Sequence, residues 1–221
     1  MDFAAGEVIL IDKPKTWTSF DVVKKIRWLI QVKKVGHAGT LDPLATGLLI
    51  LCSGKKTKTI ESIQSQEKEY IVEFKLGATT ASYDAEQPEE NLLDCGELTE
   101  AAIAKAIEGF TGEISQIPPQ FSAVKVNGKR AYKSAREGKK VEIKPRNVTI
   151  YDYELLEFKA PNWGKARIRC SKGTYIRTLV HDLGQALGVG AYILELRRTK
   201  IGDYLVEDAI TPEVFQKALG K

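Results

Sequence analysis

Apolar and polar residues follow two different periods along this chain, and the periods separate predicted strands from predicted helices. Residues 70–76 alternate strictly, with Tyr70, Val72, Phe74 and Leu76 on one face, which predicts a half-buried strand. Further strands are predicted over 7–12, 48–52, 148–158 and 166–170. Helical spacing and capping residues predict helices over 18–30, 99–110 and 175–187, and a short helix that begins at 211. The acidic segment 81–97 is predicted to be a loop.

Hairpin-like strands mixed with scattered helices predict an α+β fold rather than regular βαβ winding. The sequence contains no internal repeat, low-complexity segment or interior linker, so we expect a single domain over 1–221. An apolar content of 43% and a charged content of 28% are typical of a globular protein with a real core. The acidic N-terminus and the lack of a long apolar run argue against a signal peptide or membrane span.

Cysteine and histidine usage limits the chemistry. The three cysteines are far apart and form no C-x-x-C pair, which argues against a disulfide framework or zinc site and suits a reducing cytoplasm. Two histidines, His37 and His181, are too few for most catalytic metal centres. The count of histidines does not exclude a magnesium ion bound by carboxylates.

Basic residues are concentrated in two segments, although the net charge is only +4. Residues 118–146 hold nine basic and two acidic residues, and 165–200 hold eight basic and two acidic. Such runs are often only solvated faces, but two of them in a nearly neutral protein favour a polyanionic partner.

The segment 36–47 carries the strongest candidate chemistry, because three glycines there let the backbone turn sharply and let a ligand approach closely. It holds His37 and Asp42, and Pro43 pushes the backbone of Asp42 out of the helical region. An isolated Asp-Pro pair is commonly just a turn.

The whole twelve-residue segment resembles the catalytic loop of the TruB-type tRNA pseudouridine synthases, Gly-His-x-Gly-x-Leu-Asp-Pro-Leu-Ala-Thr-Gly. Residues 172–177 also match the family's Lys-Gly-Thr-Tyr-Ile-Arg segment without a departure. Weaker matches lie at 12–14, 68–70, 118–132 and 194–199, so the resemblance covers roughly 6–205. Thr16 departs from the pattern, since the family usually has glycine at this position.

The resemblance implies a pseudouridine synthase fold, with a mixed, largely antiparallel sheet flanked by helices. It implies isomerisation of uridine to pseudouridine at position 55 in the TΨC loop of tRNA, with no cofactor and no metal. Asp42 matches the catalytic aspartate, and Arg177 matches the arginine that would pair with it and hold it ionised. The target uridine would have to be flipped out of the folded RNA before reaction.

Four more residues match family positions around the base. Tyr70 would stack on the flipped uracil, although its place on the inner face of its strand also suits a buried core tyrosine. Tyr175 and Leu196 would complete an apolar pocket. His37 would contact the substrate, but a lone histidine beside glycines is also a common structural loop residue, and His181 matches no family position.

The segment 118–146 looks like the family's RNA-gripping insertion. Its expected contacts with the RNA backbone come from a group of residues called here the basic cluster, Lys125, Lys129, Arg130 and Lys133. With few large apolar side chains, we expect this insertion to be mobile without RNA and to close over it. The chain resembles a short form without a C-terminal PUA domain, acting on the tRNA T-arm as a cytoplasmic monomer that needs no protein partner. The open alternatives are a non-catalytic tRNA-binding chaperone and a synthase for another RNA.

Overall fold

The computed structural model describes residues 2–221, which form two compact units. Unit 1 contains the residues up to Ile71 together with Glu195–Lys221, and unit 2 is Val72–Leu194. Two strands, β4 (Lys68–Leu76) and β12 (Ala191–Ile201), run through the boundaries between the units. The prediction of one domain over 1–221 stays a prediction.

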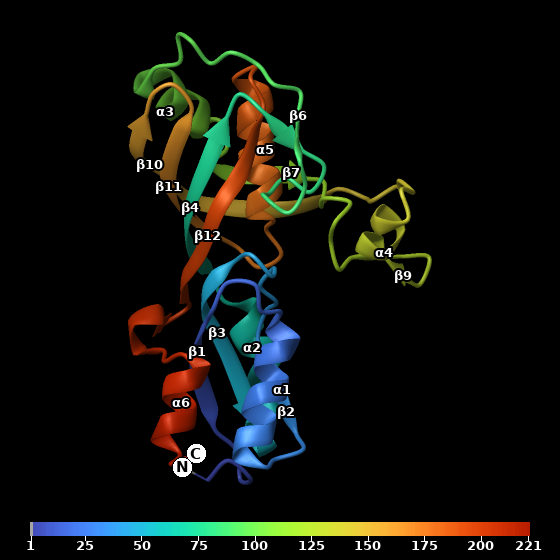
Figure 1. The fold of residues 1–221 in the computed structure, drawn as a ribbon, viewed down its shortest axis with the longest axis vertical. Helices are drawn as coiled ribbons and strands as arrows, with labels where there is room; N and C mark the ends of the chain where they lie inside the picture. The colour runs from blue at the N-terminus through green and yellow to red at the C-terminus, as the bar shows by residue number, and fades with distance from the viewer. Residues whose placement is uncertain (1) are drawn as a thin grey trace. The chain divides into compact units, whose positions relative to one another are not determined.

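Unit 1 is built on β3 (Thr46–Ser53), which pairs antiparallel with β1 (Val8–Lys13) and β2 (Val35–His37) and parallel with β12. Its helices are α1 (Ser19–Ile30), α2 (Ile60–Ser65), α6 (Pro212–Ala218) and the 3-10 helices η1 (Gly54–Thr59) and η2 (Val206–Asp208). The short strand β13 (Tyr204–Leu205) pairs antiparallel with the end of β12. Figure 1 shows α1 and α6 beside β1 and β3.

Strand β3 is apolar on both faces because both faces are covered. Leu49 and Leu51 pack with residues of α1 and α6, whereas Leu48, Ile50 and Cys52 pack with residues that include those of α2 and η2. The continuous apolar run after Gly47 is therefore a central strand with two buried faces.

In unit 2 the sheet order is β4, β11 (Trp163–Cys170), β10 (Arg146–Lys159) and β7 (Gly112–Gln116), with β10 antiparallel to both neighbours. The helices are α3 (Glu100–Glu108), α4 (Ala131–Arg136) and α5 (Ile176–Ala186). Two small ladders complete the unit: β5 (Thr79–Thr80) with β6 (Glu89–Glu90), and β8 (Lys125–Val126) with β9 (Lys129–Arg130).

The α+β class and the mixed, mostly antiparallel pairing are confirmed. The alternation over 70–76 is also confirmed, since every second residue of β4 is buried, including Tyr70. The predicted helix starts are found where capping residues stand: Thr18 forms a capping box with Asp21, and Thr99 and Thr211 cap α3 and α6.

Two details differ from the predictions. The acidic segment 81–97 is a loop except for an isolated bridge at Asp84 and the strand Glu89–Glu90, which pairs with β5. The insertion 118–146 holds more local structure than its composition suggested, namely the β8–β9 hairpin and α4, set apart from the unit 2 sheet in Figure 1. Its turn residues Asn127 and Gly128 both have positive φ, 51° and 79°, the geometry of a type I′ hairpin. The expected mobility of the insertion stays a prediction.

Cys52, Cys95 and Cys170 are all buried and none forms a disulfide. Burial raises the thiol pKa of Cys52 and of Cys95. None of the helices in the described part of the chain is long and apolar enough to cross a membrane.

Candidate active site

The glycine loop of unit 1 connects β2 with β3, and its backbone is fixed on both sides of Asp42. The buried Ser19 hydroxyl donates to the Leu41 carbonyl at 3.1 Å and accepts from the Leu41 N–H at 2.9 Å. On the other side the Ala45 N–H donates to the Asp42 carbonyl at 3.1 Å. Asp42 itself is half-buried. A partly exposed carboxylate is thus presented from a backbone with little freedom to move.

A buried lysine ties this loop to the first turn of the chain. Lys13 has no exposed surface, and its ammonium donates to three carbonyls: Pro14 at 2.9 Å, Trp17 at 2.6 Å and Pro43 at 3.2 Å. Because Pro43 directly follows Asp42, the ammonium braces the segment that carries the carboxylate.

Burial lowers the pKa of Lys13 from 10.5 to about 8; the charge of Asp42 acts against this shift, and that of Arg198 adds to it. Lys13 therefore still carries its proton at pH 7 and keeps all of its donors. It also places a positive charge close enough to Asp42 for the two groups to interact.

A second buried cation holds the other end of the loop. Arg198, on β12, is 1% exposed, and its guanidinium donates to the Leu48 carbonyl at 2.8 Å and to the Gly39 carbonyl at 3.1 Å. Gly47 lies so close to the Arg198 backbone that a Cβ there would stand 2.3 Å from the Arg198 carbonyl oxygen. Glycine is therefore required at position 47 for β3 and β12 to approach each other this closely.

Thr16 occupies a left-handed conformation, with φ of 73°. This is the position at which the sequence departs from glycine, and a threonine is strained there. Its N–H donates to the Pro43 carbonyl at 2.8 Å, so the turn keeps its bond to the loop despite the substitution.

Unit 1 also contains three of the residues expected around the base. His37 ends β2 directly before the loop; burial lowers its pKa, and its Nδ1 is buried without a hydrogen-bond partner. Tyr70 is 8% exposed on β4. Leu196 is half-buried on β12, where its carbonyl accepts from the Thr46 hydroxyl at 3.4 Å. Loop and β12 are thus joined both here and through Arg198.

In unit 2 the Arg177 side chain is fixed by its neighbours. It is 5% exposed, and its guanidinium donates to the Ser82 carbonyl at 2.8 Å and the Phe121 carbonyl at 2.9 Å. Its Nε lies 3.6 Å from Oδ2 of the buried Asp84. The Ser82 hydroxyl in turn donates to Oδ1 of Asp84 at 2.5 Å. Such a network leaves a cation with a single orientation.

Tyr175 precedes α5 and is held at both backbone groups by one amide. The Gln116 Oε1 accepts from the Tyr175 N–H at 2.7 Å, and the Gln116 Nε2 donates to the Tyr175 carbonyl at 3.0 Å. The guanidinium of Arg146 lies 5.2 Å from the centroid of the half-buried Tyr175 ring. His181, by contrast, stacks on Tyr83 at 3.8 Å between ring centroids.

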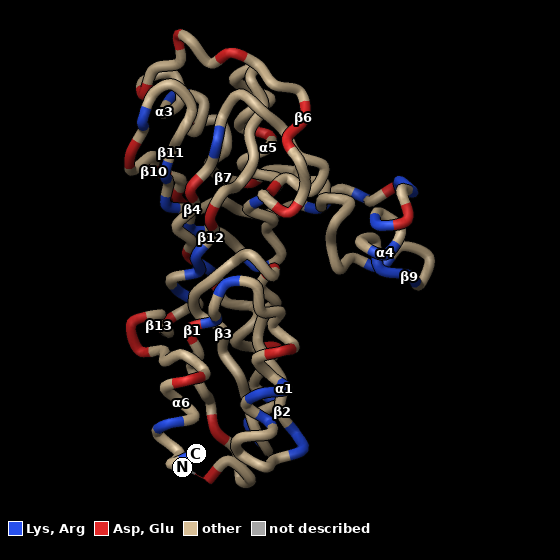
Figure 2. The backbone as a smooth tube through the Cα atoms, in the orientation of Figure 1, with Lys and Arg blue, Asp and Glu red and all other residues tan. Residues whose placement is uncertain are grey.

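All four members of the basic cluster are exposed on the lobe of the insertion. Figure 2 shows Lys and Arg gathered there around α4 and β9. Lys129 already pairs with Glu137 at 2.7 Å, so part of the positive charge is neutralised locally. Among residues 2–221, no group of three or more His, Cys, Asp or Glu is placed to hold a metal ion.

The sequence analysis missed the residues that hold the candidate groups in place: Lys13, Arg198, Asp84 and Gln116. Charged residues are expected at the surface, so a buried cation is hard to predict. One signal was present for Lys13, which occupies a buried position in the alternating pattern of β1.

Two family models match the chain. Residues 27–176 match the N-terminal domain of the TruB family of pseudouridylate synthases, and residues 177–220 match the C-terminal domain of tRNA pseudouridylate synthase B.

Among curated proteins, similar sequences are named tRNA pseudouridine synthase B. The protein of Parabacteroides distasonis is 49% identical, over 96% of this chain and 93% of its own length. Those of Phocaeicola vulgatus and Flavobacterium johnsoniae are 50% and 46% identical, each over 99% of this chain and over 95% and 98% of their own lengths.

Two solved structures have the same fold. The matched chain of a Cbf5–Nop10–Gar1 complex is 33% identical with a TM-score of 0.72, and that of an H/ACA RNP bound to a substrate RNA containing 2'-deoxyuridine is 30% identical with a TM-score of 0.73. They cover 94% and 97% of this chain, which spans about half of theirs, 52% and 53%. The predicted pseudouridine synthase fold is confirmed.

Proposed function

The chain belongs to the TruB family of pseudouridylate synthases, and on that premise we propose that it isomerises uridine to pseudouridine at position 55 in the TΨC loop of tRNA. The observation that carries the proposal is the loop of Asp42, braced by Lys13 and Arg198 and matching the family's catalytic loop throughout.

The reaction breaks the N1–C1′ glycosidic bond, turns the uracil and joins its C5 to C1′, while the hydrogen lost from C5 is balanced by one gained at N1. No atom is added and no electron is transferred, so the isomerisation consumes neither a cofactor nor a metal. It requires a carboxylate beside the sugar that acts as nucleophile or base, and Asp42 supplies it.

The remaining site residues take the roles that the resemblance implies. Tyr70 presents a flat ring for stacking on the uracil after the base has left the RNA stack. His37, Tyr175 and Leu196 contact the base, and for His37 a neutral imidazole suits a buried contact. Arg177 supplies a fixed cation whose geometry is supported by its bonds within unit 2.

We propose that 1–221 acts as one catalytic domain, with 118–146 as the insertion that grips the T-arm through the basic cluster. The exposure of that cluster supports this role, because exposed lysines and arginines can reach phosphates. We further propose that the protein is a cytoplasmic monomer that needs no protein partner. The relatives named tRNA pseudouridine synthase B support the tRNA substrate.

The direct test mixes the protein with unmodified tRNA transcript, without any cofactor, and maps pseudouridine by chemical adduct and primer extension. Modification of one T-loop uridine is the expected result. Tight binding of tRNA without pseudouridine formation would identify a non-catalytic chaperone. Modification of another RNA but not of tRNA would assign the enzyme a different substrate.

The matching variant is Asp42→Asn, which keeps the size of the side chain and removes its charge and nucleophilicity. We expect turnover to fall below about one per cent, because such roles carry several kcal/mol of the barrier. Binding of tRNA should stay within a few-fold of the parent. Residual turnover above that level would remove Asp42 from the chemistry.

A further inference from the structure

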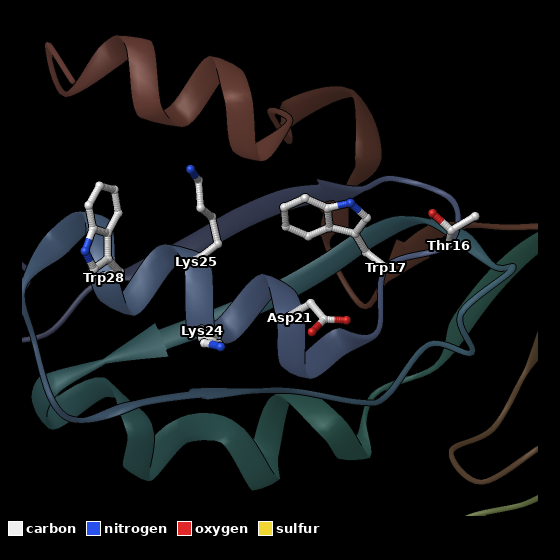
Figure 3. Close-up of a pocket in the computed structure, with 6 residues that line it drawn as sticks. All are labelled: Thr16, Trp17, Asp21, Lys24, Lys25 and Trp28. Carbon is white, nitrogen blue, oxygen red and sulfur yellow. The ribbon is translucent and has the colours of Figure 1, made fainter.

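A groove runs along α1, outside the residues that the family motifs assign to the reaction. It has a volume of about 710 Å³ and is lined by Thr16, Trp17, Asp21, Lys24, Lys25 and Trp28. In Figure 3 the side chains of Trp17, Lys25 and Trp28 extend to the same side of α1, with Lys25 between the two indole rings.

The exposure of Trp28 is unusual for a residue of its size. Its neighbours Val22, Val23, Ile26 and Leu29 are buried in the core of unit 1, whereas Trp28 is 60% exposed. An indole is among the largest apolar side chains, and leaving it in water forgoes its burial energy. The Lys25 ammonium lies 5.4 Å from the centroid of its ring, so cation and aromatic face are presented together.

The charge of the groove favours an anion. Lys24 is exposed and Lys25 half-buried, and the lining of the groove includes one carboxylate, that of Asp21. That carboxylate is already engaged, since it accepts from the Thr18 N–H at 2.9 Å and from the Thr18 hydroxyl at 2.6 Å. In Figure 3 Lys25 lies between the two indole rings, whereas Lys24 extends to the other side of α1, so Lys25 is the cation that a ligand stacked on Trp28 would meet first.

The groove is continuous with the loop of Asp42 through hydrogen bonds. Thr16 and Trp17 form its end, and the Thr16 N–H donates to the Pro43 carbonyl. The Lys13 ammonium bridges the Trp17 and Pro43 carbonyls. The end of the groove and the loop of Asp42 are therefore held together within unit 1.

We propose that the α1 groove binds a segment of the RNA substrate, with an unstacked base on Trp28 and backbone phosphates at Lys24 and Lys25. Basic side chains interleaved with exposed aromatic rings are the usual means of holding single-stranded nucleic acid. From Ser19 to Trp28 the helix rises about 14 Å, enough for more than one nucleotide. The proposal rests on the proposed function, because it takes RNA as the substrate.

The test measures the Kd of unmodified tRNA transcript by fluorescence anisotropy over a range of salt concentrations. Trp28→Ala should raise the Kd by about 5- to 150-fold, the fold-change expected for loss of one stacked base. The double variant Lys24→Gln/Lys25→Gln should weaken binding and reduce the slope of log K against log salt by roughly one to two units.

Two matched controls lie outside the groove. Phe20→Ala removes another exposed aromatic ring of α1, 64% exposed, and Lys33→Gln/Lys34→Gln removes two exposed lysines of the same unit. Both should bind tRNA as the parent does, and all variants should keep the parent's urea midpoint. If groove and control variants lost the same amount of tRNA affinity, the loss would reflect a general property of the protein surface and not the groove, and the proposal would be overturned.

The outcomes also separate this proposal from the proposed function. Groove variants that bind like an active parent would refute the groove and leave the isomerase intact. A parent that binds tRNA without forming pseudouridine, with binding lost in Trp28→Ala, would refute the isomerase and support the groove.

Discussion

Replacing Arg198 with methionine tests whether the buried cation of β12 holds the catalytic loop. The change removes the guanidinium donors to the Leu48 and Gly39 carbonyls while filling most of the same volume. Each carbonyl left without a donor costs about 1–3 kcal/mol, or about 2–6 kcal/mol for the two. Part of this is offset because a cation no longer has to be buried, so we expect a net loss of about 2–4 kcal/mol.

The loss should appear in urea unfolding and in single-turnover pseudouridine formation, since a displaced loop moves Asp42. The pKa of His37 gives an independent readout, because Arg198 contributes to lowering it. With only two histidines in the chain, ring-proton NMR can follow it, and His181→Gln assigns the signals. Arg198→Met should raise the pKa of His37, and Arg198→Lys should fall between parent and methionine in stability.

If the free energy of unfolding of Arg198→Met lay within about 0.5 kcal/mol of the parent value, the change would be no larger than that of an ordinary surface substitution. Together with an unchanged titration of His37, that result would refute the bracing role of Arg198.

Three more predictions concern single features. Tyr70→Phe should keep activity and Tyr70→Ala should lose about 1–3 kcal/mol of stacking in single-turnover assays; equal inactivity in both folded variants would mean that the hydroxyl takes part. Thr16→Gly should raise the free energy of unfolding in urea by up to about 1 kcal/mol, because relief of about 1–2 kcal/mol of left-handed strain exceeds the cost of glycine flexibility. A lower free energy of unfolding would contradict this. Neutralising the basic cluster should weaken tRNA binding and reduce the slope of log K against log salt by fewer than four units, since Lys129 already pairs with Glu137. An unchanged slope would mean that the basic cluster is only a solvated face.

Local patterns were sufficient for the elements whose burial is periodic. The alternation of β4 and the capping residues of α1 and α3 act within a few residues, so the sequence carries them directly. Strand β2 was missed because three residues are too short for a period to be recognised. The Asn-Gly turn of β8–β9 was a readable hairpin signal that the low apolar content of the insertion obscured.

The candidate site divides in a similar way. Asp42 and its loop could be found from a contiguous motif, but the cations that support the loop lie far away in the sequence. Lys13 lies 30 residues before Pro43, and Arg198 lies 150 residues after Leu48. Apart from the position of Lys13 in the alternation of β1, nothing local marks these cations as buried. Their roles depend on which carbonyls the fold brings to them, and this is settled only by tertiary structure.

The burial of all three cysteines makes this protein suitable for site-directed labelling. Inaccessible thiols with raised pKa react slowly, because the thiolate is the nucleophile. A single cysteine introduced at an exposed position, such as Lys133→Cys on α4, would then carry a spin label or dye without removal of the native thiols. The spectrum of that label, recorded with and without tRNA, would follow the insertion directly in solution.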